Sequence, residues 1–173
     1  RRQRRPMIER QRPHQPTEVH QRWQLDFKMG IALKNGSQVN LQTVREPVGA
    51  AYIGAFVSPA GQIGRNPRKV TLEEVRSTLR ACFTRWRTLP DEIQTDGEVL
   101  FIGQPQDSFP SIFTLWLMGL GIDHLVIRPG KPTDNAEVER CHRTVNDYAV
   151  VGNEDADLTQ LQRILGESID ELN

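Results

Sequence analysis

The first clear pattern along the chain is an alternation of apolar and polar residues between positions 19 and 28. Trp23, Leu25 and Phe27 are separated by polar residues, among them Asp26. A period of two residues is typical of a half-buried β-strand, because successive side chains point to opposite faces of a sheet. The pattern therefore predicts a strand that places Asp26 on the face opposite the large apolar side chains.

Two further strands are predicted before the first helix. Asn35-Gly36 is a strong signal for a tight reversal of the chain, and alternate residues from Val39 to Thr43 then form a second strand. Residues 50–57 are apolar throughout, which indicates a strand covered on both faces. Three consecutive strands joined by short turns predict an antiparallel meander.

From residue 71 onward the apolar residues recur mainly with helical spacing. Thr71 followed by Glu74 is a capping box, in which two side chains bond the unpaired N–H groups of a helix start, and it predicts a helix to about Arg87. The other predicted elements are a strand at 92–95, a loop at 97–110, a helix at 111–120, a strand at 122–127, a helix opening at Asp134 and a helix at 157–172. Strands followed by strand–helix alternation predict an α/β fold with a mixed sheet flanked by helices.

Charge divides the chain into a basic arm and one core domain. The 173 residues balance 22 basic against 22 acidic side chains, but residues 1–22 hold seven arginines against two glutamates. Proline and glutamine interrupt the first residues, so we expect a flexible linker arm at 1–20 and a core domain at 21–173. The arm fits either contact with nucleic acid or a solvated linker left by an upstream domain. No apolar run reaches the roughly 18 residues of a membrane span, so no membrane contact is expected.

Three carboxylates form a candidate site if the predicted strands take a simple arrangement. Asp26 lies within the first strand, Asp96 ends the fourth strand on a glycine turn, and Glu139 lies on the helix after the fifth strand. If the first and fourth strands are neighbours, the two aspartates are adjacent and the helix can bring Glu139 to them. Carboxylates this close raise one another's pKa, and Mg²⁺, which binds carboxylate oxygens, relieves the repulsion. Two such ions can activate the attacking oxygen and stabilise the leaving one in phosphoryl transfer.

Each acid also has an ordinary structural interpretation. A single aspartate in a strand, such as Asp26, is more often an exposed-face residue, and Asp96 before a glycine is more often part of a turn. Glu137 and Glu139 compete for the helix position, but they lie about 200° apart around the helix axis and cannot face the same ions. Glu137 has the capping-box spacing from Asp134, which leaves Glu139 as the candidate.

Five short stretches of the sequence resemble a known family. They are WQLDF at 23–27, TDGE at 95–98, GIDH at 121–124, RPGKP at 128–132 and DNAEVER at 134–140. In order and context they are similar to the catalytic core of retroviral-type integrases and of Asp-Asp-Glu insertion-sequence transposases, over roughly residues 19–150. The resemblance implies a ribonuclease-H-like fold with a five-stranded sheet, two Mg²⁺ or Mn²⁺ ions per active site, and Asp26, Asp96 and Glu139 as catalytic metal ligands. One departure is that 42 residues lie between Asp96 and Glu139, more than the family usually has. The excess fits the 101–110 loop, which can lengthen at little entropic cost.

The activity implied by the resemblance is DNA nicking followed by strand transfer, as in DNA integration and transposition. Two alternatives stay open, a ribonuclease-H-like nuclease without strand transfer and a catalytically silent, domesticated core that binds DNA. The implied partners are DNA, as donor ends and target, and a second copy or larger assembly of the chain, because two DNA ends must be joined. Two widely separated cysteines fit a reducing compartment, so we expect the cytoplasm, beside the prokaryotic nucleoid during reaction.

Polar and basic residues near Glu139 are the candidates for contact with DNA. They are Lys131, Asn135, His142, Arg143 and Asn146. Groups of this kind position phosphates rather than read bases. Arg143 equally fits an ordinary solvated helix residue, and we expect His124, beside the fifth strand, to be structural.

Overall fold

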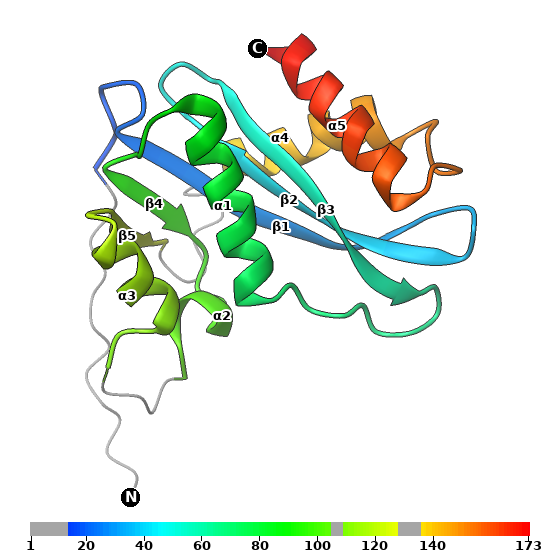
Figure 1. Cartoon of the computed structure of the whole chain (residues 1–173), viewed down its shortest axis with the longest axis horizontal. Helices are drawn as coiled ribbons and strands as arrows, with labels where there is room; N and C mark the ends of the chain where they lie inside the picture. The colour runs from blue at the N-terminus through cyan, green and yellow to red at the C-terminus, as the bar shows by residue number, and fades with distance from the viewer. Residues whose placement is uncertain (1–13, 105–108, 128–135) are drawn as a thin grey trace, which may run out of the picture.

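The computed structural model describes residues 14–104, 109–127 and 136–173, and in these ranges a twisted sheet carries helices on both faces (Figure 1). The strands are β1 (Arg22–Ala32), β2 (Ser37–Arg45), β3 (Tyr52–Gln62), β4 (Glu92–Thr95) and β5 (Asp123–Val126). The helices are α1 (Leu72–Trp86), α2 (Val99–Ile102), α3 (Ile112–Gly119), α4 (Ala136–Val145) and α5 (Leu158–Leu172). A π-helical turn over Asn146–Val150 continues α4. The predicted α/β class is confirmed.

β1 lies at the centre of the five-stranded sheet, whose strand order is β3-β2-β1-β4-β5. β1, β2 and β3 form the predicted antiparallel meander, and Gly36 in the first turn has φ +84°, which residues with a Cβ rarely adopt. β4 runs parallel to β1, and β5 runs parallel to β4. The mixed sheet is therefore confirmed, with the first and fourth strands as neighbours.

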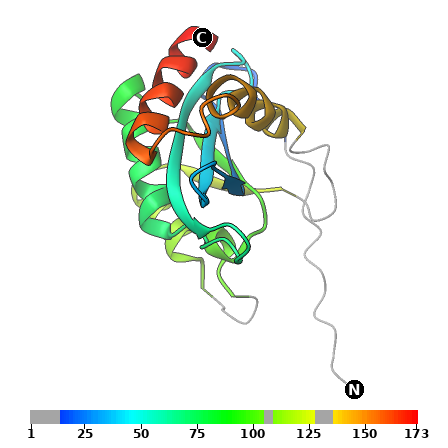
Figure 2. The same cartoon turned by 90° about the vertical axis from the view of Figure 1, so that its right-hand side faces the viewer.

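The sheet has one apolar core on each face. Trp23 and Leu25 of β1 pack with Val75 and Leu79 of α1, and all four side chains are buried. α4 lies on the opposite side of the sheet from α1 (Figure 2), and its Cys141 belongs to the second core, together with residues of β2, β3 and α5. Because strand side chains alternate, the first half of β1 gives Trp23, Leu25 and Phe27 to the α1 face and Asp26 to the α4 face, up to the register shift after Lys28.

Helix starts follow the local chemistry of the sequence. Thr71 and Glu74 form the predicted capping box of α1, in which the Glu74 carboxylate accepts the Thr71 N–H at 2.7 Å. Asp157 and Gln160 form a second capping box at the start of α5. The predicted start of α4 at Asp134 lies outside the described residues.

Two elements differ from the expected ones. β3 continues to Gln62, five residues beyond the strand predicted over residues 50–57, because Val39 and Gln38 of β2 pair with Pro59 and Gly61. α2 forms inside the predicted loop at 97–110, and it buries Phe101 against Phe27 and Phe113 at ring distances of 5.2 and 5.1 Å. A one-turn helix with a single buried anchor has too few residues to show helical periodicity in a sequence.

α5 covers the outer edge of β3 (Figure 1). Gln162 accepts the Val57 N–H at 2.9 Å and donates to the Ala55 carbonyl at 3.1 Å. Asn173 accepts the Tyr52 N–H at 2.7 Å and donates to the Tyr52 carbonyl at 2.9 Å. Side-chain amides thus satisfy backbone groups that an edge strand otherwise leaves exposed for pairing with another chain.

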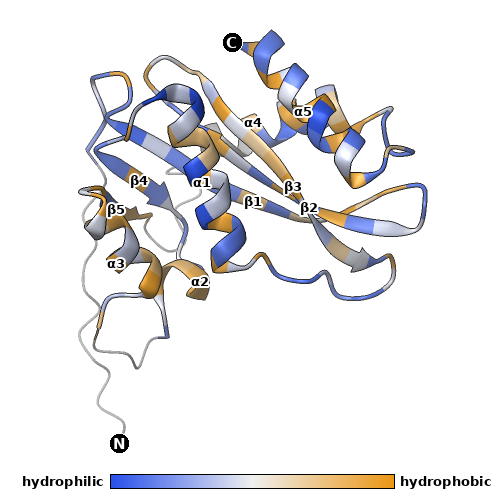
Figure 3. Ribbon diagram, viewed as in Figure 1, coloured by the Kyte–Doolittle hydropathy of each residue, from blue (hydrophilic) through white to orange (hydrophobic). Residues whose placement is uncertain are grey.

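Apolar residues lie along β2 and β3 and on α3 (Figure 3). On α3, Ile112, Leu115 and Met118 are exposed, while Phe113 and Leu117 are buried. No helix in the described part of the chain is long and apolar enough to cross a membrane.

Candidate active site

Asp26 lies in the middle of β1, on the face that α4 covers. It pairs with Thr43 of β2 across the antiparallel ladder. One carboxylate oxygen, Oδ1, accepts the N–H of Phe27 at 2.9 Å, and the other, Oδ2, lies 3.3 Å from Nε2 of His142 on α4. The Asp26 side chain is 15% exposed, so it borders solvent without being fully hydrated. It is a partly buried carboxylate on a rigid central strand, not the solvated surface residue of the alternative interpretation.

Asp96 follows the last residue of β4 and lies level with Asp26. The parallel register pairs Trp23 with Ile93 and Gln24 with Gln94. Asp26 lies two residues after Gln24, and Asp96 lies two residues after Gln94. Asp96 Oδ1 accepts the Glu98 N–H at 3.0 Å. Burial raises the pKa of Asp96, the Glu98 N–H opposes this rise, and the negative charge of Asp26 adds to it. The two aspartates are therefore close enough to repel each other.

Glu98 is a third carboxylate in this group that sequence reasoning did not single out. Burial raises the pKa of Glu98, and the charges of Asp96 and Asp26 raise it further, whereas Lys69 lowers it. The feature of the sequence that could have identified Glu98 is its position two residues after Asp96, in the TDGE stretch. A local turn explained that spacing equally well, because nothing in it shows that the chain folds back toward β1.

Glu139 lies on α4, which packs against both β1 and β2. The side chain of Glu139 lies outside the described part of the structure, so its predicted approach to the aspartates stays a prediction. The next turn of the same helix is described, and it contacts the site, because Cys141 and His142 face Thr43 and Asp26. Burial raises the pKa of the Cys141 thiol to about 11, and the charge of Asp26 contributes to the rise.

The DNA-binding candidates on α4 and its π-helical continuation differ in their surroundings. Arg143 is exposed, and Asn146 is half-buried with its amide 3.5 Å from the Asp147 carboxylate. His142 is buried beside Asp26, with 6% of its surface exposed, and its predicted contact with DNA stays a prediction. The position of His142 on the polar side of the predicted helix did not indicate its burial, because the residues that cover it belong to β2. Lys131 and Asn135 lie outside the described residues.

His124 has the structural role expected of it. Its Nε2 lies 2.9 Å from Oγ1 of Thr95, and its Nδ1 lies 2.8 Å from Oγ1 of Thr114 on α3. The ring also meets Phe113 edge-on at 5.1 Å. These contacts fix α3 to the strand ends next to Asp96.

The donor set fits a hard divalent cation. Asp26 and Asp96 offer carboxylate oxygens, which Mg²⁺ prefers, and their mutual repulsion is the kind that a bound cation relieves. Within residues 14–104, 109–127 and 136–173, no three histidine, cysteine or acidic side chains complete a metal-binding group. Glu139, whose side chain lies outside the described part of the structure, is the predicted third ligand.

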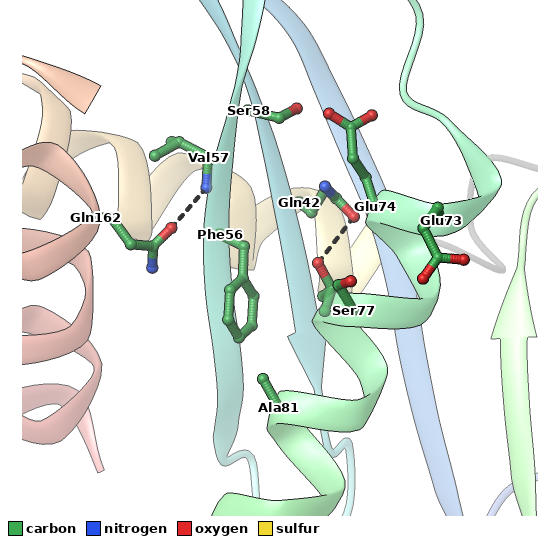
Figure 4. Close-up of a pocket in the computed structure, with 10 residues that line it drawn as sticks. Gln42, Phe56, Val57, Ser58, Glu73, Glu74, Ser77, Ala81 and Gln162 are labelled. Atoms are coloured by element: carbon green, nitrogen blue, oxygen red, sulfur yellow. Dashed lines mark hydrogen bonds between the residues drawn. The ribbon is translucent and has the colours of Figure 1, made fainter. Parts of the chain in front are cut away.

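A separate hollow of about 430 Å³ lies over β2 and β3, between α1 and α5 (Figure 4). Its lining includes Phe56, Glu73 and Glu74. Thr78 donates to Gln42 at 3.1 Å at its floor. Its glutamates repel phosphate, and it does not include Asp26 or Asp96, so it is not the candidate active site.

A mixed sheet with an antiparallel meander, two parallel strands and helices on both faces is the ribonuclease-H-like fold, which integrase catalytic cores share. In sequence, residues 120–173 match the family model described as the integrase core domain. No protein with a curated description matches the sequence.

Chains of retroviral integrases are among the solved structures with the same fold. A chain of the simian T-cell lymphotropic virus intasome, in complex with PP2A regulatory subunit B56 gamma, superposes with a TM-score of 0.62 at 19% identity over 92% of this chain. This chain spans about half, 53%, of that intasome chain. The HTLV-2 integrase catalytic core domain in complex with magnesium gives 0.61 at 18% identity, over 89% of this chain and 86% of that one. The BIV integrase catalytic core domain gives 0.55 at 16% identity, over 89% and 84%. The resemblance to integrase catalytic cores inferred from the sequence is confirmed.

Proposed function

We propose that this chain is the catalytic core of a metal-dependent polynucleotidyl transferase that nicks DNA and joins the freed 3′ end to a target strand. The observation that carries the proposal is the convergence of Asp26 and Asp96 at one level of two neighbouring parallel strands. The helix that bears Glu139 packs on β1, the strand of Asp26, and on its other neighbour β2. The integrase core domain match over residues 120–173 supports the same class of activity.

In this proposal Asp26, Asp96 and Glu139 hold two Mg²⁺ or Mn²⁺ ions. Such ions, when bound, supply activation of the attacking oxygen and stabilisation of the leaving oxygen. The chain's own part is to fix the carboxylates. Asp26 is held by a central strand and Asp96 by its bond from the Glu98 N–H, so both are oriented before the ions arrive.

The proposed partners are DNA and further copies of the chain. One solved relative of the fold is an intasome chain, and HTLV-2 integrase cores were solved as a dimer and as a trimer with magnesium. Arg143 is exposed on α4, three residues after Arg140, and we assign it a contact with a DNA phosphate. A homodimer or larger assembly would bring two such sites to the two DNA ends.

The proposal is tested with two substrates in parallel. Supercoiled plasmid with Mn²⁺ reports nicking, and a labelled duplex with a recessed 3′ end reports joining to a second DNA. We expect both products from the wild type and neither from Asp26→Asn or Asp96→Asn. Nicking without joining would assign the chain to ribonuclease-H-like nucleases, and binding of DNA without either product would indicate a silent core.

A further inference from the structure

The helix that carries Glu139 also carries a buried histidine whose ring reaches Asp26. Nε2 of His142 lies 3.3 Å from Oδ2 of Asp26. Oγ1 of Thr43 lies 3.3 Å from Nε2 and 3.4 Å from Nδ1 of the same ring. A buried imidazole without hydrogen-bond partners is costly, and Asp26 and Thr43 are the groups that can satisfy its nitrogens here.

Thr43 joins these residues into one unit. It is fully buried, it pairs with Asp26 across β1 and β2, and it also hydrogen-bonds the thiol of Cys141. Two consecutive residues of α4, Cys141 and His142, are therefore tied to the pair of strands that holds Asp26. A helix fixed in this way cannot rotate about its axis without breaking both contacts.

The contacts fix the Asp26 carboxylate from both ends. Oδ1 is held by the N–H of Phe27 and Oδ2 by the His142 ring. His142 is also three residues from Glu139, which puts both residues on one face of α4. The contact between His142 and Asp26 thus ties α4, the helix that contains Glu139, to the strand that bears Asp26.

We propose that His142 is a positioning residue, whose ring donates Nε2–H to Asp26, rests against the Thr43 hydroxyl, and holds the Asp26 carboxylate ready to bind a divalent ion. The inference rests on the proposed function, because it takes Asp26 to be a metal ligand. Hydrogen-bond partners behind a ligand typically contribute about 10–100-fold to metal affinity. His142 acts through Asp26 and touches neither the ion nor DNA.

The test is Mn²⁺ affinity of the full chain, read from the electron paramagnetic resonance signal of unbound Mn²⁺. His142→Leu removes the donor, and we expect the Kd to rise by about 10–100-fold. His142→Gln keeps an N–H near the position of Nε2, and we expect its Kd to stay within about threefold of the wild-type value. Val145→Ala is the matched control, because it removes a buried apolar side chain of the same helix and leaves the contacts of His142 with Asp26 and Thr43 in place. It should lower thermal stability with an unchanged Kd.

A folded His142→Leu variant with wild-type Mn²⁺ affinity would overturn the positioning role. If this variant does not fold, Thr43→Val decides, because it removes the hydroxyl that orients the ring. A several-fold rise in Kd supports the role, and an unchanged Kd refutes it. Asp26→Asn separates the two proposals. Mn²⁺ binding that is insensitive to Asp26→Asn refutes the metal role of Asp26 and with it the inference, whereas sensitivity to Asp26→Asn with insensitivity to His142→Leu refutes the positioning role alone.

Discussion

Arg22 and Glu92 face each other at the first pair of the β1–β4 ladder, and the Arg22 guanidinium donates to the Glu92 carboxylate at 2.7 Å. The Arg22 side chain is 3% exposed and that of Glu92 is 14% exposed, so the ion pair is largely removed from water. It lies four residues before Asp26 and four before Asp96. The pair thus stabilises the strand register that brings the two aspartates level.

Replacing Arg22 alone should destabilise the fold. In Arg22→Leu the Glu92 carboxylate stays in a largely buried position without its main partner, and we expect the free energy of unfolding to fall by about 3–5 kcal/mol. Urea denaturation measures the change. The double variant Arg22→Leu/Glu92→Leu should recover most of the loss, because two packed apolar side chains leave no buried charge. A single variant as stable as the wild type would mean that the pair does not hold the register.

The repulsion at Asp96 predicts how the stability of the metal-free protein depends on pH. Burial and the charge of Asp26 raise the pKa of Asp96, so the folded chain keeps its proton at pH values where the unfolded chain has lost it. The contribution of Asp96 to the free energy of unfolding should therefore fall as pH rises from about 4, the usual pKa of aspartate, through the raised pKa of the folded state. In EDTA, Asp96→Asn should flatten this fall and be at least as stable as the wild type at pH 7. Thermal unfolding between about pH 3.5 and about pH 7 measures how stability changes with pH. Parallel curves for the wild type and Asp96→Asn would contradict the prediction.

The choice between Glu139 and Glu137 on α4 can be decided by a matched pair of variants. Glu139→Gln should reduce strand transfer by more than about 100-fold, because loss of a metal ligand exceeds the effect of losing a hydrogen-bond partner behind one. Glu137→Gln should keep activity, since its predicted role is in the helix cap. Gel assays on the recessed 3′ end substrate, together with circular dichroism for folding, measure both. The opposite pattern would move the metal-ligand role to Glu137.

Arg143 should contribute to DNA affinity through phosphate and not through base identity. Arg143→Glu is expected to weaken binding to all DNA sequences alike and to reduce the slope of log affinity against log salt by about 1 or more. Fluorescence anisotropy at several salt concentrations gives the slope. Arg80→Glu is the control, because Arg80 is an exposed arginine on α1, on the other side of the sheet. Equal slopes for the wild type and Arg143→Glu would remove Arg143 from the interface.

The parts of the fold that local chemistry decides could be predicted from the sequence. The capping box of Thr71 and Glu74 placed the start of α1, and the alternation around Leu25 placed the middle of β1 and the face of Asp26. The continuation of β3 to Gln62 could not be predicted, because Ser58 and Pro59 belong to the strand only through their pairing with β2.

The acidic residues of the candidate site could be predicted from the sequence, but the residues that surround them could not. Asp26 within the first strand and Asp96 at the end of the fourth could be placed by assuming that these strands are neighbours, and the structure brings the two residues together. Glu98 and His142 depend on contacts between segments far apart in the chain. His142 is 99 residues from Thr43, and its distance to that hydroxyl is set by the packing of α4 on β2. No local pattern encodes such a contact.

The side-chain amides of Gln162 and Asn173 at the edge of β3 affect how copies of the chain can associate. Gln162 and Asn173 occupy the donors and acceptors between Tyr52 and Val57 that a neighbouring molecule would require for lateral strand addition. A neighbouring strand that added to this edge of β3 would first have to displace both side chains. Copies that meet along this part of β3 must therefore join through side-chain surfaces and not by extending the sheet.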